Sequence, residues 1–448
     1  MLVHVRYDEI ALKGGKRSWY ERRLRRNLAQ QTGLARRQIE RYEGRIALHL
    51  REEDDPVRVL DGVRRTFGAT SGAVVHVVAR TEPEAEQARI FELAIAVARE
   101  AVQGGARTFK VVCRRADKRY PVASMPFAAL VGMHVLQAVP ELKVDIHTPD
   151  LEIPVELRPE ALYVATKGVQ GPGGYPVGAS GRALALLSGG IDSPVGAWYA
   201  LKRGLHVDGV YFHAPPFTGE QAKEKVLTLG RAIGRWCPSP LRVFVVGVTA
   251  IQEAIKRGLG SRGEFRIVLL RRSMYRLARA LAQARGFVAL VTGEALGQVA
   301  SQTPENLLAV EAVVPDMLVL RPLIGFDKRE IVDMARKIGT FETSILPFQD
   351  CCSLFAPRHP ATHVSVERCL ELEALVPDLP ALEAAALQAA EVHRGVHGAP
   401  FMRLAEAWDS MDNVVEEFGE KDGADEADEA DEADEADEAP APGGSAPG

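Results

Sequence analysis

Long apolar runs are missing from this chain. No stretch approaches the roughly 20 consecutive apolar residues that a membrane-spanning helix needs. The N-terminal segment MLVHVRYDEIALKGG also lacks the apolar core of a secretory signal peptide. Cysteine is scarce, with 5 in 448 residues, which excludes a disulfide scaffold and favours reactive thiols in a reducing compartment. These absences predict a cytoplasmic protein with no membrane partner.

The remaining composition is that of a soluble globular chain. Hydrophobic residues make up 46% and charged residues 26%, which excludes a mostly disordered protein. A length of 448 residues predicts two to four domains.

The charge is unevenly distributed. The formal net charge is −5, but residues 416–448 contain 14 acidic residues and one lysine, which leaves +8 for residues 1–415. The first 50 residues carry 12 Lys and Arg against 5 Asp and Glu. A basic N-terminal end suits a polyanionic partner such as nucleic acid, and the alternative is a solvated helix face.

The C-terminal segment is of low complexity. Residues 424–438 repeat Ala-Asp-Glu five times, and Pro, Gly and Ser follow. Because such a segment lacks apolar groups and repels itself, we expect residues 401–448 to form a disordered acidic tail. Its expected purpose is solubility, and mimicry of nucleic acid is the alternative.

The segment at residues 168–181, GVQGPGGYPVGASG, predicts a linker. Beyond it, short apolar segments alternate with helical patterns, which predicts a doubly wound parallel α/β sheet. The expected strands are 183–187, 207–213, 241–248 and 287–293, and the expected helices are about 194–203, 219–235 and 264–285.

Before the linker the pattern favours one or two small α+β domains. The elements expected there are strands at 2–12 and 45–51, a basic helix at 13–31, a helix at 84–103, a strand at 108–115, a helix at 124–138 and strands within 141–165.

The string LLSGGIDSP, from Leu186, joins an apolar strand to a helix. Its glycines let the backbone approach a phosphate, and the turn presents consecutive N–H groups. Ser193 is expected to cap the helix and Pro194 to occupy its first position, where the helix dipole favours an anion. The string is neither a Walker A loop nor GxGxxG, and a purely structural βα turn is the alternative.

The full SGGxDS string resembles the loop of the PP-loop ATP pyrophosphatases, which have an adenine nucleotide alpha hydrolase-like fold. These enzymes cleave ATP between the α- and β-phosphates and adenylate a substrate oxygen. The resemblance implies a phosphate site at Ser188, Gly189, Gly190, Asp192 and Ser193, with Asp192 assisting Mg²⁺ or adenylation.

Further strings narrow the resemblance to the tRNA 4-thiouridine synthetases, also called tRNA sulfurtransferases. These strings are YFHAPPFT (211–218), TGEALGQVASQT (292–303), RPLIGFDKREI (321–331) and ETSILPFQDCCSLFAP (342–357). Their order and spacing fit this family along residues 1–400. The resemblance implies a ferredoxin-like domain at 1–58, a THUMP RNA-binding domain at 59–167, a linker at 168–181, a PP-loop domain at 182–400 and the acidic tail at 401–448.

The resemblance also implies a reaction. ATP activates O4 of uridine 8 in tRNA with release of pyrophosphate, and a cysteine persulfide charged by a cysteine desulfurase then delivers sulfur to C4 and expels AMP. The implied cofactors are ATP and Mg²⁺, and the implied assembly is a homodimer. The family also supplies sulfur to the thiazole sulfur-carrier protein of thiamine biosynthesis.

Residue roles follow from motif position within the family. Cys351 matches the catalytic cysteine, with Cys352 as a backup or second sulfur carrier, and Lys328 matches the lysine that contacts ATP. Arg321 has a similar expected role. The other implied nucleotide contacts are Leu186, Leu187, Tyr211, Phe212, Arg271, Gly293 and Gln302.

Basic residues near the N-terminus make a separate case for RNA binding. On one helix, residues 22, 25 and 26 share a face, as do 16, 19, 20 and 23. Phosphate contacts from such faces give salt-dependent affinity. The expected RNA-binding residues are Lys13, Lys16, Arg17, Arg22, Arg23, Arg25 and Arg26, with Trp19 and Tyr20 among them.

The chain departs from the longer family members, which append a rhodanese domain with a second cysteine. The chain after residue 400 is too short for that domain, so the resolving thiol and the role in thiamine synthesis stay open. Cys352, Cys237 and Cys369 are the candidates for the resolving thiol.

Several alternatives remain at this point. The cysteine pair can be two small buried hydrophobes. A zinc site of Cys352, His359, His363 and Cys369 has irregular ligand spacing. The rival functions are another PP-loop enzyme, such as a 2-thiouridine synthetase or an amide-forming ligase, and an RNA-binding protein with a vestigial ATP site.

Overall fold

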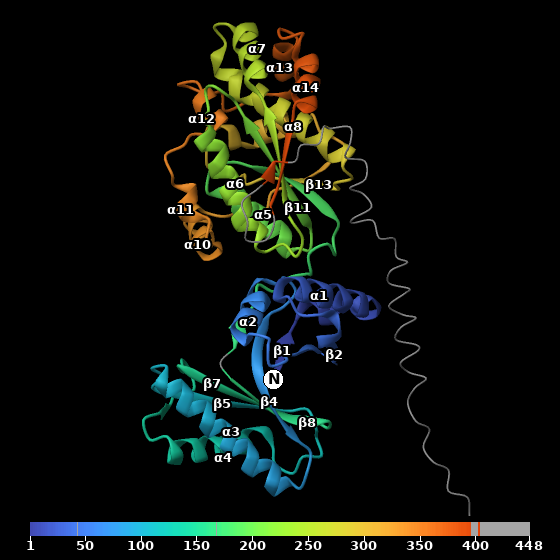
Figure 1. Cartoon of the computed structure of the whole chain (residues 1–448). Helices are drawn as coiled ribbons and strands as arrows, with labels where there is room; N and C mark the ends of the chain where they lie inside the picture. Colours follow the sequence, from blue (N-terminus) through green and yellow to red (C-terminus); the bar gives the residue numbers. More distant parts are fainter. Residues whose placement is uncertain (43, 167, 396–401, 404–448) are drawn as a thin grey trace, which may run out of the picture.

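The structure is a computed structural model that describes residues 1–42, 44–166, 168–395 and the backbone of residues 402–403. Figure 1 shows two bodies, a lower one coloured blue to teal and an upper one coloured green to red. Each body is built around one β-sheet. The acidic repeat at 424–438 lies outside the described residues.

The lower sheet has nine strands within the described part of the chain. Its order is β2-β3-β1-β4-β8-β7-β5-β6, and β9 pairs with β4 outside this path. Most neighbours are antiparallel, but β5 runs parallel to β6 and β7. The strands are β1 (Leu2–Arg6), β2 (Ile39–Tyr42), β3 (Arg45–His49), β4 (Ser71–Ala79), β5 (Thr108–Arg115), β6 (Lys143–Val144), β7 (Leu151–Leu157), β8 (Ala161–Ala165) and β9 (Val169–Gln170).

Two helix pairs pack on this sheet and enclose two separate apolar cores. The first half carries helices α1 and α2, and the second carries α3 and α4. Because β4 pairs with β1 on one side and β8 on the other, the two halves share one continuous sheet. The helices are η1 (Glu9–Lys16), α1 (Arg17–Thr32), η2 (Arg36–Gln38), α2 (Pro56–Arg65), α3 (Pro83–Gln103) and α4 (Ser124–Ala138).

Local sequence explains these helices. Pro83 opens α3, acidic residues occupy its first turn, and its buried face is Ile90, Leu93, Ala94 and Val97 at helical spacing. The expected domain boundary between residues 58 and 59 falls inside α2, whose Val59 and Val63 belong to the first core.

The expected strand at 2–12 is wrong beyond Arg6, because the chain there turns into η1 and Glu9 pairs with Arg203 of the upper body. The expected basic helix begins at Arg17, and residues 13–16 belong to η1.

The upper sheet confirms the doubly wound α/β expectation. Its order is β14-β13-β10-β11-β12-β15-β16, and β14 to β12 run parallel. β15 and β16 add an antiparallel edge, which the sequence pattern did not indicate. The strands are β10 (Arg182–Leu187), β11 (His206–His213), β12 (Arg242–Gly247), β13 (Ala289–Val291), β14 (Leu318–Leu320), β15 (Glu391–Arg394) and β16 (Met402–Arg403).

Helices cover both faces of this sheet. Alternate residues of β10 point to opposite faces, so that Leu184 joins one core while Ala185 and Leu187 join the other. The face of Ala185 carries α5 (Asp192–Lys202), α6 (Glu220–Gly234), α10 (Lys328–Ile338) and α11 (Phe341–Ser344). The face of Leu184 carries α7 (Thr249–Leu259), η3 (Gly263–Phe265), α8 (Arg266–Ala284), α9 (Pro304–Glu311), α12 (Cys351–Phe355), α13 (Val366–Glu373) and α14 (Leu379–Gln388). The short helix η4 (Ala300–Gln302) precedes α9.

Helix α1 lies at the junction of the two bodies (Figure 1). Asn27 Nδ2 donates to the carbonyl of Val177 at 3.1 Å, and Gln31 Nε2 donates to the carbonyl of Arg235 at 3.3 Å. Phe67 of the lower body packs into the core that contains Trp198 and, at its edge, Trp236. The expected linker segment therefore lies against α1.

Candidate active site

The loop after β10 lies where ligands bind in open α/β sheets. β10 leads to β11 on one side and neighbours β13 on the other, so the strand order reverses at its carboxyl end. The Ser188 N–H donates to Ser193 Oγ at 2.9 Å, and the Gly190 N–H donates to Ser188 Oγ at 3.2 Å. The loop is thus held closed by its own hydroxyl groups.

The expected capping role of Ser193 is wrong. Helix α5 begins at Asp192, Ile191 is its N-cap, and Pro194 is its third residue. The Ser193 hydroxyl is occupied by the Ser188 N–H, because the tight turn brings that backbone group to the first turn of the helix.

Asp192 and Lys328 lie 136 residues apart in sequence and meet in space. Lys328 Nζ is 2.5 Å from Asp192 Oδ1, and Gln298 Nε2 donates to Asp192 Oδ2 at 2.7 Å. Lys328 is the first residue of α10. Asp327 and Glu330 form a capping box there, which fixes the start of the helix and therefore the position of the lysine.

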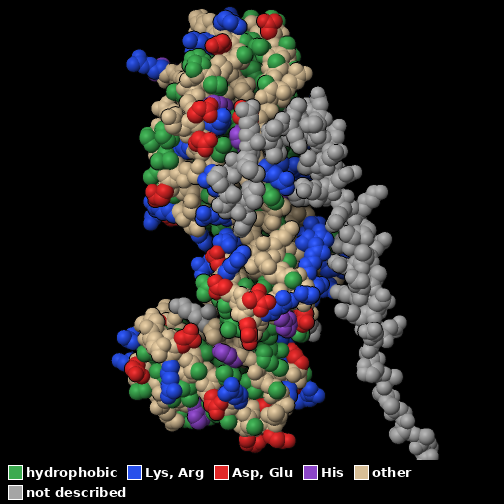
Figure 2. All heavy atoms as spheres, in the orientation of Figure 1, with side chains coloured by type: hydrophobic (Ala, Val, Ile, Leu, Met, Phe, Trp, Pro, Cys, Tyr) green, Lys and Arg blue, Asp and Glu red, His purple; other side chains and the backbone are tan. Residues whose placement is uncertain are grey.

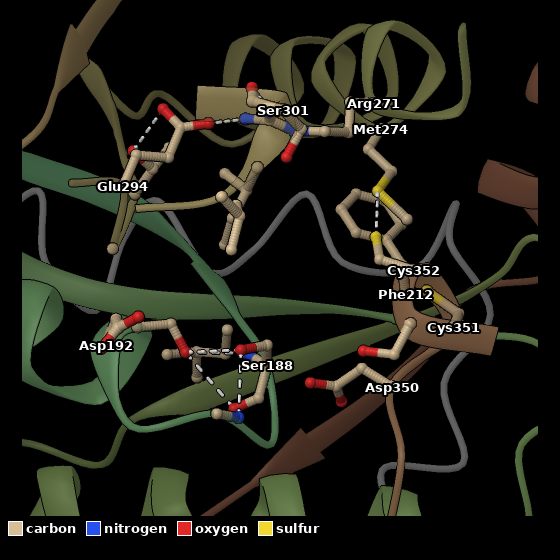
Figure 3. A pocket seen from close by; sticks show the side chains of 18 of the residues that line it. Ser188, Asp192, Phe212, Arg271, Met274, Glu294, Ser301, Asp350, Cys351 and Cys352 are labelled. Carbon is tan, nitrogen blue, oxygen red and sulfur yellow. Dashed lines mark hydrogen bonds and ion pairs between the residues drawn. The ribbon is translucent and has the colours of Figure 1, made fainter. Parts of the chain in front are cut away.

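A cavity of about 300 Å³ extends from this loop across the ends of the strands (Figure 3). Gly189 and Lys328 are outside its lining, although Gly189 lies in the loop and Lys328 contacts Asp192. The expected residues that line it are Leu186, Leu187, Ser188, Gly190, Asp192, Ser193, Tyr211, Phe212, Arg271, Gly293, Gln302 and Cys351.

Gly293 is required for a close approach between two elements. A Cβ atom at this position would lie 2.5 Å from the backbone nitrogen of Ser193 and 2.6 Å from the carbonyl carbon of Asp192. Only glycine therefore allows the loop after β13 to pack against the first turn of α5.

Glu294 is a site residue that the sequence reasoning missed, although it lies in the quoted TGEALG string. Its carboxylate pairs with Arg271 and accepts hydrogen bonds from Tyr275 Oη at 3.0 Å and Arg321 Nε at 2.7 Å. Arg271 also donates to the carbonyl of Ser301 at 2.5 Å. Arg321 was expected to neutralise phosphate charge. Its guanidinium instead contacts Glu294 and Glu311 and makes no contact with the phosphate loop among those that the structure describes.

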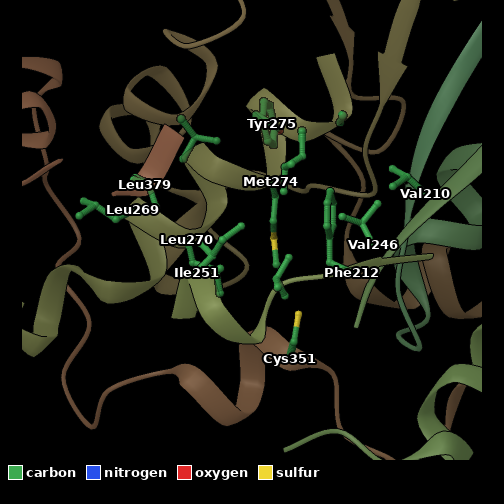
Figure 4. Close-up of a cluster of buried hydrophobic side chains, with 14 of the residues drawn as sticks. Val210, Phe212, Val246, Ile251, Leu269, Leu270, Met274, Tyr275, Cys351 and Leu379 are labelled. Carbon is green, nitrogen blue, oxygen red and sulfur yellow. The ribbon is translucent and has the colours of Figure 1, made fainter. Parts of the chain in front are cut away.

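The cysteine pair lies at the other end of the cavity, in the first turn of α12. Cys351 is buried at the edge of the apolar core of Figure 4, and Cys352 Sγ lies 3.9 Å from Met274 Sδ. A hydrogen bond with Cys352 and burial raise the pKa of the Cys351 thiol. The same hydrogen bond lowers the pKa of Cys352, and the nearby Arg271 lowers it further.

Asp350 and Lys225 connect the cysteine turn to the loop. Both Asp350 carboxylate oxygens accept the Gly189 N–H, at 3.0 and 3.1 Å. Buried Lys225, on α6, donates to the carbonyls of Leu346 at 2.8 Å and Phe348 at 3.3 Å. Burial raises the pKa of Asp350. The hydrogen bond from Gly189 and the charge of Lys225 oppose this shift but do not cancel it. Sequence spacing gave no signal for Lys225.

The other two candidates for the resolving thiol, Cys237 and Cys369, are both buried. Cys237 belongs to the core on the opposite face of the sheet, and burial raises its pKa. Burial also raises the pKa of Cys369, on α13. The described residues contain no group of three or more His, Cys, Asp or Glu side chains placed to hold a metal ion.

Family models match three successive segments of the chain. The ThiI ferredoxin-like domain matches residues 2–72, the THUMP domain residues 84–167, and the thiamine biosynthesis protein (ThiI) model residues 178–376. A probable tRNA sulfurtransferase of Brevibacillus brevis is 40% identical over 84% of this chain and 94% of its own length. That of Thermotoga maritima is 41% identical over 87% of this chain and 97% of its own.

The chain belongs to the tRNA sulfurtransferase family. The expected family is thereby confirmed. Among solved structures, a 4-thiouridine synthetase–RNA complex with bound ATP is 40% identical, with a TM-score of 0.76 over 88% of this chain and 99% of that one. PH1313 from Pyrococcus horikoshii shares the fold, at 23% identity and a TM-score of 0.55.

The expected RNA-binding residues of this family member lie on η1 and α1, at the level where Figure 2 shows Lys and Arg side chains gathered between the two bodies. Several make contacts within the protein: Lys13 lies over Tyr175, Arg17 pairs with Glu21, and Arg22 donates to Ser18. The guanidinium of Arg23 lies over Trp19.

The neighbouring segment adds basic residues that the sequence reasoning missed. Arg25 donates to the carbonyl of Arg36 at 3.1 Å, which brings exposed Arg36 and Arg37 beside α1. Lys16 is also exposed. In the part of the chain that the structure describes, none of the helices has the length and apolar character to span a bilayer.

Proposed function

We propose that this chain transfers sulfur to tRNA in an ATP-dependent reaction that converts uridine 8 to 4-thiouridine. The observation that carries the proposal is the single cavity that joins a phosphate-type loop at Ser188 and Asp192 to a thiol pair at Cys351 and Cys352. The relative solved with RNA and bound ATP supports both substrates.

The proposed chemistry has two steps. Uracil O4 attacks the α-phosphorus of ATP, which forms an O4-adenylyl tRNA and releases pyrophosphate. The terminal sulfur of a persulfide on Cys351 then attacks C4, and AMP leaves with the former O4. Cys352, the adjacent thiol, then attacks the Cys351 sulfur, which releases 4-thiouridine as the leaving thiolate and leaves a Cys351–Cys352 disulfide. A dithiol reductant restores the two thiols for the next turnover. The adenylation is needed because a carbonyl oxygen is a poor leaving group.

The site residues fit these steps by their chemistry. The apolar walls at Phe212 and Met274 suit an adenine ring, and the loop N–H groups suit phosphate oxygens. Lys328, half-exposed beside Asp192, is placed to neutralise phosphate charge in the transition state.

Magnesium fits the same end of the cavity. Mg²⁺ is usually held by one or two carboxylates plus substrate phosphates rather than by a protein cage, and Asp192 is the carboxylate that would hold it. Bound there, the ion would neutralise charge on the phosphates.

The partners follow from the reaction. We propose a cysteine desulfurase as the persulfide donor, a homodimer as the assembly, and the cytoplasm, where thiols stay reduced, as the compartment. Sulfur transfer to the thiazole sulfur-carrier protein is a further proposed activity, supported by the thiamine biosynthesis family model.

The test is mass spectrometry of nucleosides from tRNA incubated with the pure protein, ATP, magnesium, cysteine and a desulfurase. We expect an ATP-dependent 4-thiouridine peak. ATP turnover to AMP and pyrophosphate without that peak would overturn the acceptor assignment, and a 2-thiouridine peak would favour the rival thiolase function.

A further inference from the structure

Asp350 precedes helix α12 but does not cap it. It stands at the N-cap position of α12, where aspartate normally accepts hydrogen bonds from its own helix. Its carboxylate makes no such bond and instead accepts the Gly189 N–H of the phosphate loop, through both oxygens. Figure 3 draws Asp350 between the loop at Ser188 and the cysteine pair.

The Gly189 N–H belongs to the loop that the proposed function assigns to the phosphates of ATP. A carboxylate and a phosphate are both anions, and they cannot share one N–H donor at hydrogen-bond distance without strong repulsion. Phosphate binding at Gly189 therefore requires that Asp350 give up this contact.

Because Asp350 immediately precedes the two cysteines, a movement of Asp350 also moves their thiols. Cys351 and Cys352 follow it in the chain and form the first turn of α12. Cys351 is only 4% exposed, which is too little for an external persulfide donor to reach its sulfur. On release, the Asp350 carboxylate has an alternative partner in the N–H groups of its own helix, so two arrangements are available to it.

We propose that Asp350 is a positioning residue, which holds the cysteine turn against the phosphate loop until the pyrophosphate part of ATP takes the Gly189 N–H. Occupancy of the loop then exposes Cys351 for sulfur loading. The device orders the reaction, because the thiol becomes accessible only when nucleotide is bound. This inference rests on the proposed binding of ATP at the loop.

The experiment uses the full chain and inorganic pyrophosphate, which occupies the loop without filling the adenine end of the cavity. The rate of Cys351 alkylation by iodoacetamide is followed by peptide mapping, with and without saturating pyrophosphate and magnesium. We expect pyrophosphate to accelerate alkylation by at least about fivefold, the lower end of typical coupling between sites. Buried Cys237 is the internal reference, and its rate stays constant.

The variant Asp350→Asn keeps the size of the side chain but removes its charge. We expect it to be alkylated quickly without pyrophosphate, to respond little to pyrophosphate, and to bind pyrophosphate more tightly by calorimetry. The matched control is Asp378→Asn, because Asp378 is an exposed N-cap residue of α14 that also makes no capping bond. This control should behave as the wild type.

The outcomes separate the two proposals. Pyrophosphate binding by the wild type with an unchanged alkylation rate would overturn the coupling and leave the proposed function standing. Complete lack of binding of both pyrophosphate and ATP would overturn the proposed function and the coupling with it. The wild-type comparison decides the question even if Asp350→Asn fails to fold.

Discussion

At the scale of single residues, Asp192 connects three segments through one carboxylate. It begins α5, pairs with Lys328 at the start of α10, and accepts a hydrogen bond from Gln298 in the loop after β13. A group in this position organises the loop and the lysine together, so its loss removes the ion-pair partner of Lys328 and the carboxylate that we propose to hold Mg²⁺.

We therefore expect Asp192→Ala to reduce ATP-dependent pyrophosphate release by at least about 100-fold, the usual loss when one preorganised electrostatic contact is removed. Binding of tRNA should be unchanged, because the basic residues lie on other elements. Asp333→Ala, an exposed change on α10, is the control. Pyrophosphate release at the wild-type rate would remove Asp192 from the catalytic machinery.

The pKa values of the two thiols are shifted in opposite directions, so the thiols should differ in reactivity at neutral pH. The pKa of Cys352 lies below its ordinary value and that of Cys351 well above. Because the thiolate is the reactive form, Cys352 should be alkylated first at neutral pH in the protein without nucleotide. As the pH rises towards the pKa of Cys351, its rate should increase and the difference should shrink. Peptide mapping across pH 6 to 10 measures both rates, and Cys351 reacting first would contradict these directions.

The carrier assignment is tested by a pair of isosteric variants. We expect Cys351→Ser to keep ATP cleavage but to lose sulfur transfer, because serine cannot hold a persulfide. Cys352→Ser should still form the bond between the persulfide sulfur and C4 but leave the tRNA attached to Cys351 as a mixed disulfide, because it removes the thiol that frees the product. A single turnover measured before and after addition of a dithiol reductant separates the two, because the reductant releases 4-thiouridine only from the Cys352→Ser variant. Full thiolation by the Cys351→Ser variant would mean that another cysteine carries the sulfur.

At the scale of elements, α1 combines a structural and a proposed functional face. Leu24, Asn27, Leu28 and Gln31 face the core and the upper body, while the arginines at 22, 25 and 26 are half-buried at the surface. Helix periodicity allows both faces on one element. The same helix that fastens the two bodies together therefore carries the basic surface.

Reversal of charge at Arg22, Arg25 and Arg26 to Glu should weaken tRNA binding and flatten its dependence on salt, because fewer counterions are released per complex. The matched control replaces three other basic residues, Lys256, Arg257 and Arg262, with Glu. These residues are exposed on α7 and in the loop after it, and α7 lies at the far end of the upper body. Binding would be compared by filter retention over a salt series. An equal loss in both triple variants would reduce the effect to net charge.

How much the sequence predicted also depends on the element. The strand–loop–helix unit at residues 182–202 was predictable, because apolar β10, the glycine turn and α5 are all local signals. β15 was not, since its polar residues become a strand only by pairing with β12. The contact between Asp350 and Gly189 spans 161 residues, and spacing alone gives no sign of such a long-range contact.

At the scale of the whole molecule, the site is assembled from segments far apart in the chain. The loop at 188–193, the α8 side chains Arg271 and Met274, the segment 292–302 and the cysteine turn all meet in one cavity. The sequence motifs identified most of these members, because each is a short string. They meet in one site because the parallel sheet places the carboxyl ends of its strands at the same edge.

The distribution of charge over the whole chain leads to the last prediction. Residues 416–448 hold 14 acidic residues and one lysine, so a chain that ends at residue 415 changes from a net −5 to +8. Because tRNA is a polyanion, we expect this truncated chain to bind tRNA more tightly than the full chain at low salt. The difference should disappear at about 1 M salt, where charges more than roughly 3 Å apart are screened. Equal affinity at low salt would show that the acidic segment does not act on the RNA-binding surface, which would leave solubility as its role.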